Sequence, residues 1–165
     1  MLTTETIPGL SAARRARVEA TSAPVIVFLD DDDNQPEPNY LVNLVTLLRQ
    51  YPQVGVWGPG RIQVEFTEAV DAWVEANKWL FQERNNEAVV FGREQHWTAH
   101  HPGGTGQIVL RDVMQHYESL VDTNAVTLTG RTGKSLARGE DAQIIYTASS
   151  TGITLACRRI WLFTT

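Results

Sequence analysis

Four consecutive aspartates, Asp30 to Asp33, are the residues of this sequence best suited to chemistry. They follow the apolar run 25–29, which predicts a strand buried on both faces, as in a parallel sheet. Ligands of open α/β sheets gather at the carboxyl ends of the strands. Asp30 and Asp32 are two positions apart, so a turn can direct both carboxylates at one point. Such hard oxygen ligands suit Mg²⁺ or Mn²⁺, bound together with substrate phosphates.

The alternative interpretation of this acidic run is a solvated loop ahead of a helix N-terminus, where negative charge is stabilising. Four adjacent like charges repel one another, and a helix start needs only one or two of them, so we favour metal binding. An EF-hand is excluded, because Gln35 occupies the position of its required glycine and Leu41 that of its bidentate glutamate.

A second pair of carboxylates, Glu140 and Asp141, follows Gly139 at the predicted start of a helix. By itself the pair is explained by the helix dipole, which favours negative charge there by about 0.3–1 kcal/mol. Together with a metal-binding strand end, the pair acquires a second interpretation, in which one carboxylate takes a proton from an attacking hydroxyl.

Gly133, Lys134 and Ser135 match the end of a phosphate-binding P-loop. The complete pattern requires a glycine five residues before Gly133, where this chain has Leu128. We therefore disfavour a P-loop nucleotide hydrolase and expect a basic loop able to lie near an anionic leaving group. The cations of this loop are Arg131, Lys134 and Arg138.

The histidines and the single cysteine give weaker signals. His96, His100 and His101 have no standard zinc-site spacing and are at least as well explained as ordinary loop residues. Cys157 lies in a short apolar run and is interpreted as a small core residue.

The elements that must position these groups alternate between strand and helix, which predicts an α/β protein with one domain over residues 1–165. Strands are predicted at 25–29, 54–57, 61–66, 108–110, 153–155 and 160–163. Helices are predicted over 11–23 and 68–84, after Pro38, after Leu110, and from Glu140 to Gly152, with 85–106 irregular.

The composition restricts the class of protein. A chain of 165 residues, 42% hydrophobic and 20% charged, can bury a core like that of a soluble globular protein. A net charge of -5 argues against nucleic acid as a partner, because duplex binding depends on clustered Lys and Arg. The N-terminus lacks a signal-peptide pattern, and no apolar run reaches the about 18 residues of a membrane span. We therefore expect a soluble, cytoplasmic chain.

Three segments, in this order, resemble motifs of the family-2 glycosyltransferases, which have the GT-A fold. Residues 9–14, Gly-Leu-Ser-Ala-Ala-Arg, are similar to the family's G-x-S-x-A-R-N segment. Residues 28–32, followed by 38–41, resemble its D-x-D strand end and the helix beyond it. Residues 128–135, running on to 139–141, resemble its acceptor-side loop and E-D motif.

This resemblance implies a partial GT-A-type, Rossmann-like fold with a mixed, mostly parallel sheet flanked by helices. It implies transfer of a sugar from a nucleotide-diphosphate-sugar donor to a hydroxyl of a carbohydrate or glycolipid acceptor, with inversion. Asp30 and Asp32 would contact the metal and the diphosphate, and Mn²⁺ or Mg²⁺ would stabilise the leaving group. Asp141 would be the general base, and Glu140 would position the acceptor or the loop.

By the same resemblance, a loop and strand that include Gly106 and Gln107 would line the acceptor side, near His100 and His101. The basic loop with Arg131, Lys134 and Arg138 would lie at the donor diphosphate or on the acceptor side. The alternative function is a non-catalytic module that keeps the fold and binds a metal ion or a protein partner through the acidic loop.

Several features depart from the family pattern. Arg15 and Arg17 stand where the family has Asn and Gly, and Thr164 and Thr165 where many relatives carry a metal-binding histidine. The family's first β-α-β unit, which reads the nucleotide base, has no counterpart here. We therefore interpret the chain as a truncated catalytic domain that binds donor nucleotide weakly and is inactive or poorly active by itself. An uncovered sheet edge would favour pairing with a second copy, so we expect a homodimer.

Overall fold

The computed structural model describes residues 4–7, 9–29, 34–94, 96–98, 100–123, 125 and 139–164; at Asn34 and over 158–164 it describes the backbone alone. Five of the predicted site residues lie outside the described residues. These are Asp30, Asp32, Arg131, Lys134 and Arg138.

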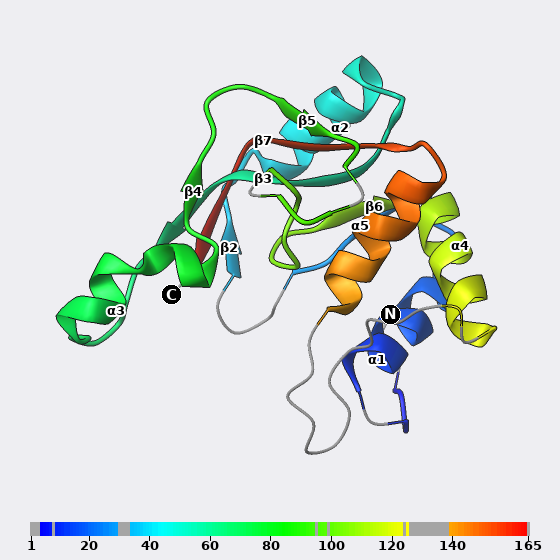
Figure 1. The fold of residues 1–165 in the computed structure, drawn as a ribbon, viewed down its shortest axis with the longest axis horizontal. Coiled ribbons are helices and arrows are strands. Elements are labelled where there is room, and N and C mark those ends of the chain that lie inside the picture. The colour runs from blue at the N-terminus through cyan, green and yellow to red at the C-terminus, as the bar shows by residue number, and fades with distance from the viewer. Residues whose placement is uncertain are drawn as a thin grey trace.

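The described chain contains both helices and strands, as the sequence predicts, but they do not strictly alternate (Figure 1). The helices are α1 (Leu10–Glu19), α2 (Tyr40–Gln50), α3 (Ala72–Ala76), the 3-10 helix η1 (Lys78–Phe81), α4 (Arg111–Asp122) and α5 (Glu140–Ser150). The strands are β1 (Val25–Val27), β2 (Asn34–Pro36), β3 (Val54–Val64), β4 (Arg84–Asn85), β5 (Val90–Gly92), β6 (Ile108–Leu110) and β7 (Thr154–Thr164).

The strands form one mixed sheet in the order β1-β6-β3-β7-β2, with β4 added to β3 and β5 to β7. Among the described strand pairs, β3 and β7 are parallel and the others are antiparallel. The expectation of a mostly parallel sheet is therefore wrong. The apolar run 25–29 correctly indicated a strand with apolar contacts on both faces, but coverage of both faces does not require parallel neighbours, and β1 pairs antiparallel with β6.

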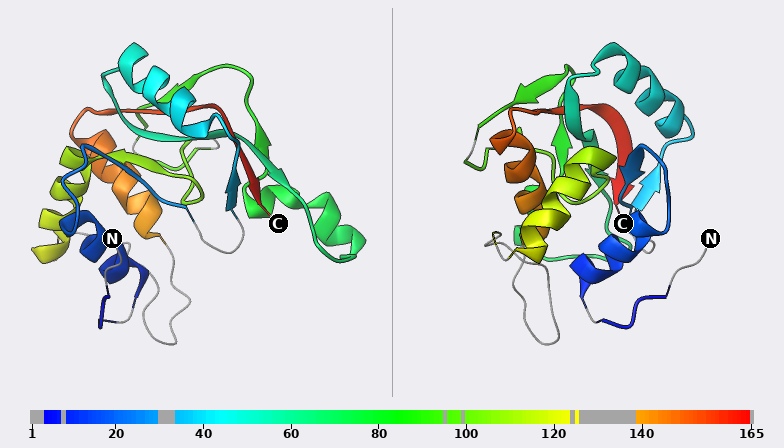
Figure 2. Two further views of the ribbon diagram at one scale, coloured as in Figure 1. Left: turned by 180° about the vertical axis from the view of Figure 1, so that it is seen from behind. Right: turned by 90° about the vertical axis from the view of Figure 1, so that its right-hand side faces the viewer.

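Helices cover both faces of this sheet, and each face has its own hydrophobic core. In Figure 2, α1, α4 and α5 lie on one side of the sheet and α2 on the other. Alternate residues of the central strands point into the two cores, as the pleat of a strand requires. Thus Val56 and Val109 belong to the core beneath α4 and α5, whereas Trp57 and Ile108 belong to the core beneath α2.

Two pairs of short strands expected from the sequence are single long strands. Residues 58–60, Gly-Pro-Gly, were expected to end a strand, but they lie inside β3. The register between β3 and β7 shifts between Pro59 and Arg61, so an irregularity in the ladder accommodates the segment. The two strands expected near the C-terminus are likewise joined as β7.

The prediction of one long helix over 68–84 is also wrong. Asp71 caps α3 by accepting a hydrogen bond from the Trp73 backbone N–H at 2.8 Å, and Asn77 ends this five-residue helix. The chain continues as η1 and leaves it at Gln82, whose φ of 67° is left-handed. No residue of α3 or η1 is buried, so the apolar spacing in this segment does not mark a core-facing stripe.

Two helix ends test the capping predictions. Helix α1 begins at Leu10 after Gly9, one residue before the Ser11 expected as its N-cap. Helix α5 ends before Gly152, whose φ of 76° is the left-handed conformation expected of a terminating glycine. Within the described part of the chain, the helices are too short or too polar for any of them to span a bilayer.

Candidate functional site

The end of β1, the start of β6 and the first turn of α5 meet at one place. The backbone N–H of Phe28 donates to the carbonyl of Gln107 at 2.8 Å, which extends the β1–β6 pairing by one residue. The Gln107 side-chain amide donates in turn to the carbonyl of Asp141 at 3.4 Å. Gln107 is fully buried, so the polar side chain of a residue next to β6 connects the sheet to the α5 N-terminus.

Arg14 connects three segments in this region. Its guanidinium forms an ion pair with Glu140 at 3.1 Å, and its central carbon lies 4.7 Å from the centroid of the Phe28 ring. The side chains of Arg14 and Glu140 are only 11% and 9% exposed. A cation on α1 thus contacts the end of β1 and the first residue of α5 at the same time, in an environment where charge pairs are weakly screened.

Glu140 is held in place by these contacts. It is buried, and its second carboxylate oxygen accepts a bond from the Gly139 backbone N–H at 3.4 Å. Through its ion pair with Arg14, Glu140 connects α1 to α5. Its predicted role in positioning the acceptor or the loop stays a prediction.

Asp141 lies beside Glu140 in the first turn of α5 and is partly buried. Its Oδ1 atom accepts a hydrogen bond from the Ala142 backbone N–H at 2.9 Å, which fixes the carboxylate at the helix N-terminus. Its Oδ2 atom faces Gly104, where an added Cβ would be 3.0 Å from that oxygen. The glycine therefore leaves room for this carboxylate at the surface of the 103–107 loop.

The 103–107 loop is itself fixed from the opposite side. The Gln82 amide donates to Thr105 Oγ1 at 3.0 Å, and a Cβ at Gly103 would lie 1.8 Å from Gln82 Oε1. The Tyr40 hydroxyl donates to the Gly106 carbonyl at 3.4 Å, and Gly106 has a φ of 63°. Burial raises the pKa of Tyr40 far above its usual value, so this hydroxyl keeps its proton and remains a donor.

The structure thus brings together the four predicted site residues that it describes: Glu140, Asp141, Gly106 and Gln107. Sequence reasoning missed Gln82 and Tyr40, because each acts on a loop that is distant in sequence. It quoted Arg14 as part of a motif but gave it no role. No signal in the sequence distinguished Arg14 from the neighbouring Arg15, because a buried cation is recognised by the carboxylate that pairs with it, and Glu140 is distant in sequence.

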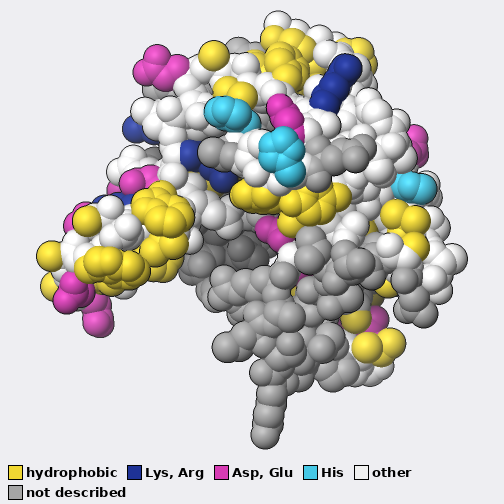
Figure 3. Space-filling model, in the orientation of Figure 1, with side chains coloured by type: hydrophobic (Ala, Val, Ile, Leu, Met, Phe, Trp, Pro, Cys, Tyr) yellow, Lys and Arg dark blue, Asp and Glu magenta, His cyan; other side chains and the backbone are white. Residues whose placement is uncertain are grey.

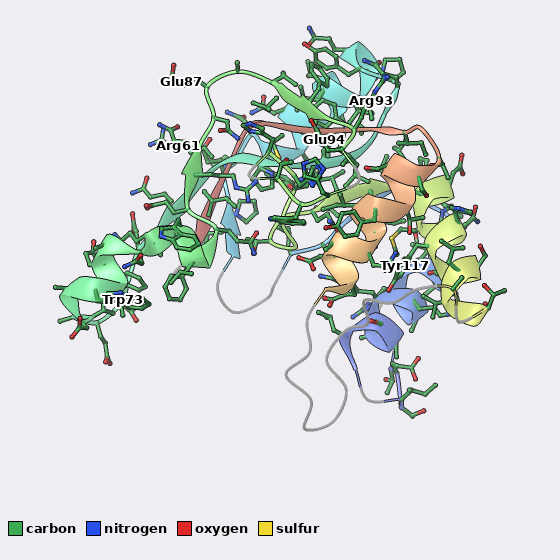
Figure 4. The ribbon with its side chains drawn as sticks, in the orientation of Figure 1. Arg61, Trp73, Glu87, Arg93, Glu94 and Tyr117 are labelled. Carbon is green, nitrogen blue, oxygen red and sulfur yellow. The ribbon has the colours of Figure 1, made fainter. Side chains whose placement is uncertain are left out.

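The histidine-rich loop has a mainly structural arrangement. His101 is fully buried; its Nδ1 accepts from the Thr98 backbone N–H at 3.3 Å, and its Nε2 lies 3.6 Å from a Glu94 carboxylate oxygen. Burial lowers the pKa of His101, which keeps the ring neutral. Glu94 lies on the loop after β5, in the upper part of the molecule (Figure 4). The contact between Glu94 and His101 therefore joins a carboxylate to a neutral, buried imidazole ring.

Cys157 is buried, which confirms its interpretation as a core residue. Its thiol donates to the His100 carbonyl at 3.3 Å. Burial raises the pKa of this thiol, which disfavours the reactive thiolate form.

The fit of a metal ion depends on the acidic run. Among the residues that the structure describes, no group of three or more His, Cys, Asp and Glu side chains could hold a metal ion. Glu140 is neutralised by Arg14 and is a poor candidate for a further ligand. The metal ligands predicted from the sequence, Asp30 and Asp32, lie outside the described residues, and carboxylates are the groups that hold Mg²⁺ or Mn²⁺ together with substrate phosphates.

Together these observations define a mixed α/β protein whose polar contacts converge where β1, the 103–107 loop and α5 meet. When compared with known proteins, the sequence matches no protein-family model and no curated protein.

Proposed function

We propose that this chain is the catalytic domain of a metal-dependent, inverting glycosyltransferase of the GT-A type. It transfers a sugar from a nucleotide-diphosphate-sugar donor to an acceptor hydroxyl. The observation that carries the proposal is the position of Arg14, which contacts Phe28 and Glu140. These three residues belong to the three segments that resemble family-2 glycosyltransferases, so the segments contact one another through residues that the structure describes.

The proposed reaction is a single displacement. The acceptor oxygen attacks the anomeric carbon, the bond from that carbon to the diphosphate oxygen breaks, and the nucleoside diphosphate leaves with the bonding electrons. The proton of the acceptor hydroxyl passes to the Asp141 carboxylate. Because the nucleophile enters opposite the leaving group, the configuration at the anomeric carbon inverts.

The surroundings of Asp141 suit this role. Its Oδ1 is held by the backbone of α5, and its Oδ2 faces the 103–107 loop. Gln107 and Glu140 restrain the same turn of helix through the Asp141 carbonyl and through Arg14. A base held in this way loses little entropy when the acceptor hydroxyl approaches it.

Asp30 and Asp32 would hold the metal ion, which when bound supplies positive charge at the leaving diphosphate. The sequence places Asp30 two residues after Phe28, the residue whose backbone is bonded to Gln107. This short separation in sequence supports the assignment of both carboxylates to the same site as Asp141.

The test is a titration of Mn²⁺ by calorimetry, with and without UDP or GDP. We expect weak binding of each ligand alone and a strengthening of each by the other, because the ion would be shared by protein carboxylates and phosphate oxygens. Asp32→Ala should abolish this synergy, whereas Asp33→Ala, which removes the same group one residue away, should largely retain it. Metal binding that is indifferent to nucleotide would favour the non-catalytic module instead.

A further inference from the structure

The segment 65–83, which connects β3 to β4, exposes an unusual amount of apolar surface. It contains α3 and η1, neither of which buries a residue, and it projects from the body of the molecule in Figure 1. Its exposed large side chains are Val70, Trp73, Trp79, Leu80 and Phe81, and the two tryptophans are 64% and 66% exposed. A short helix that buries no residue gains little stability from packing, and an exposed apolar surface of this kind is typical of a binding site.

The segment 65–83 is nevertheless fixed at its base. The rings of Phe66 and Phe81 make an edge-to-face contact with centroids 5.5 Å apart, and the Lys78 ammonium lies 5.4 Å from the Phe66 centroid. The Glu83 carboxylate accepts from the Val64 backbone N–H at 3.5 Å. These contacts fix the base of the segment that carries the exposed apolar side chains.

A groove of about 780 Å³ runs along this segment. Its apolar lining includes Phe66, Val70 and Ala72. Its charged lining consists of Glu65, Glu68, Glu75, Glu83 and Lys78. Lys78 is paired with Glu75 at 2.6 Å, so the groove combines an excess of negative charge with a few apolar lining side chains. Figure 3 shows hydrophobic and acidic side chains side by side on this projection.

The charge of the groove decides among the occupants that an apolar surface attracts. A second copy would bring the same carboxylates against one another, and anionic lipid surfaces attract basic segments. A cationic segment with an apolar face satisfies both features, because its apolar side chains can contact Phe66, Val70 and Ala72 and its Lys or Arg side chains can pair with the carboxylates. We propose that the groove on segment 65–83 binds a basic, amphipathic protein segment.

The proposal does not depend on glycosyl transfer and is tested by binding alone. The probe is a synthetic helical peptide of about 18 residues in which leucine forms one face and lysine the other. The matched peptide has glutamate in place of every lysine. We expect the lysine peptide to bind and to shift the tryptophan fluorescence, because the exposed Trp73 and Trp79 lie on the same segment as the groove, and we expect the glutamate peptide not to bind.

Variants locate the binding. Glu68→Lys reverses one charge of the groove and should weaken the lysine peptide by about tenfold. Glu87→Lys makes the same change in net charge at an exposed position on the β4–β5 connection, well separated from Trp73 in Figure 4, and should have little effect. Val70→Ser should weaken binding, whereas Leu41→Ser, at an exposed position of α2, should not.

Three results would overturn the proposal. The first is equal weakening by Glu68→Lys and Glu87→Lys, which would mean unspecific attraction to an acidic protein. The second is binding of neither peptide, or of both equally. The third is binding to neutral phosphatidylcholine vesicles that Val70→Ser abolishes and the lysine peptide does not displace, which would make the segment a membrane contact.

Discussion

Arg14 is one of two adjacent arginines on α1 whose surroundings differ sharply. Its partner Glu140 is 9% exposed, whereas the neighbouring Arg15 pairs with Glu19 and Asp122, whose side chains are 59% and 54% exposed. Removing one member of a buried pair leaves a charge without compensation, while exposed pairs contribute little. The two residues therefore form a matched comparison.

We expect Arg14→Ala to lower the free energy of unfolding by about 3 kcal/mol, because Glu140 would remain buried and unpaired. Arg15→Ala should cost less than about 1 kcal/mol. Urea denaturation of both variants measures the difference. The double variant Arg14→Ala, Glu140→Ala should lose less than the sum of the single losses, and strict additivity would contradict the coupling.

Asp141 is the residue whose side chain the proposed chemistry uses. Asp141→Asn keeps the shape of the side chain but removes the base, so sugar transfer should fall by about 100-fold or more with the thermal unfolding temperature nearly unchanged. Asp112→Asn is the control, because Asp112 holds the same second position in α4. Sugar transfer by Asp141→Asn at the same measurable rate as by Asp112→Asn would remove Asp141 from the reaction.

His101 makes stability depend on pH. Burial lowers its folded-state pKa, so between that value and the usual value of about 6.5 the unfolded chain binds more protons than the folded one. The free energy of unfolding should therefore decrease as the pH falls below about 6.5. His101→Gln should flatten this dependence between neutral pH and mild acid, whereas His116→Gln, at an exposed position of α4, should leave it unchanged. The measurement is urea denaturation across this pH range.

At the scale of elements, the sequence predicted type and order better than direction and length. The apolar run 25–29 predicted a strand, and β1 lies there, with Ile26 in one core and Val25 and Val27 packed against the other. The direction of the neighbouring strands was not predictable from this run. Helices cover both faces of the sheet, and they do so whether neighbouring strands are parallel or antiparallel. It was decided by β6, which pairs antiparallel with both β1 and β3.

The candidate site was predictable only in part. Glu140 and Asp141 stood out because carboxylates at a helix start have a physical role even without chemistry. The roles of Gln82 and Tyr40 could not be predicted, because their hydrogen bonds to Thr105 and Gly106 join segments far apart in the sequence. Periodicity also failed over 68–84, where apolar side chains face solvent and not a core.

One prediction concerns the packing of β3 against the chain that follows α5. A Cβ at Gly55 would lie 2.3 Å from Ile153 Cγ2 and 3.0 Å from Val113 Cγ2. Gly55→Ala should therefore destabilise the protein by about 1–3 kcal/mol through overpacking. Adding Ile153→Ala should recover part of this loss, as a thermal denaturation cycle can measure; no recovery would mean that the strain lies elsewhere.

At the scale of the whole molecule, β1 is the end of the described strand order. Phe28 bonds to Gln107 and Arg111 bonds to Pro24, so Val25 and Val27 direct their backbone groups away from β6. An edge of this kind can pair with another chain. The homodimer expected from the sequence would use these groups.

Light scattering at high concentration tests this association. We expect a dimer, and we expect Val27→Pro to give a monomer, because proline removes an outward N–H without breaking the bonds between β1 and β6. Leu41→Ser, on the exposed surface of α2, serves as the control and should remain dimeric. A clean monomer for the unmodified chain would contradict the prediction.

We propose that the acidic run and the α5 N-terminus form one metal-dependent site. Paramagnetic broadening of backbone amide signals by Mn²⁺ tests it directly, because the broadening reports which residues lie nearest the ion, whatever the affinity for nucleotide. We predict selective broadening at Phe28, Gln107 and Asp141 that Asp32→Ala abolishes and Asp33→Ala retains. Broadening centred instead on Glu65 to Glu83, or broadening that is unchanged in Asp32→Ala, would contradict a metal site formed by the acidic run and the α5 N-terminus.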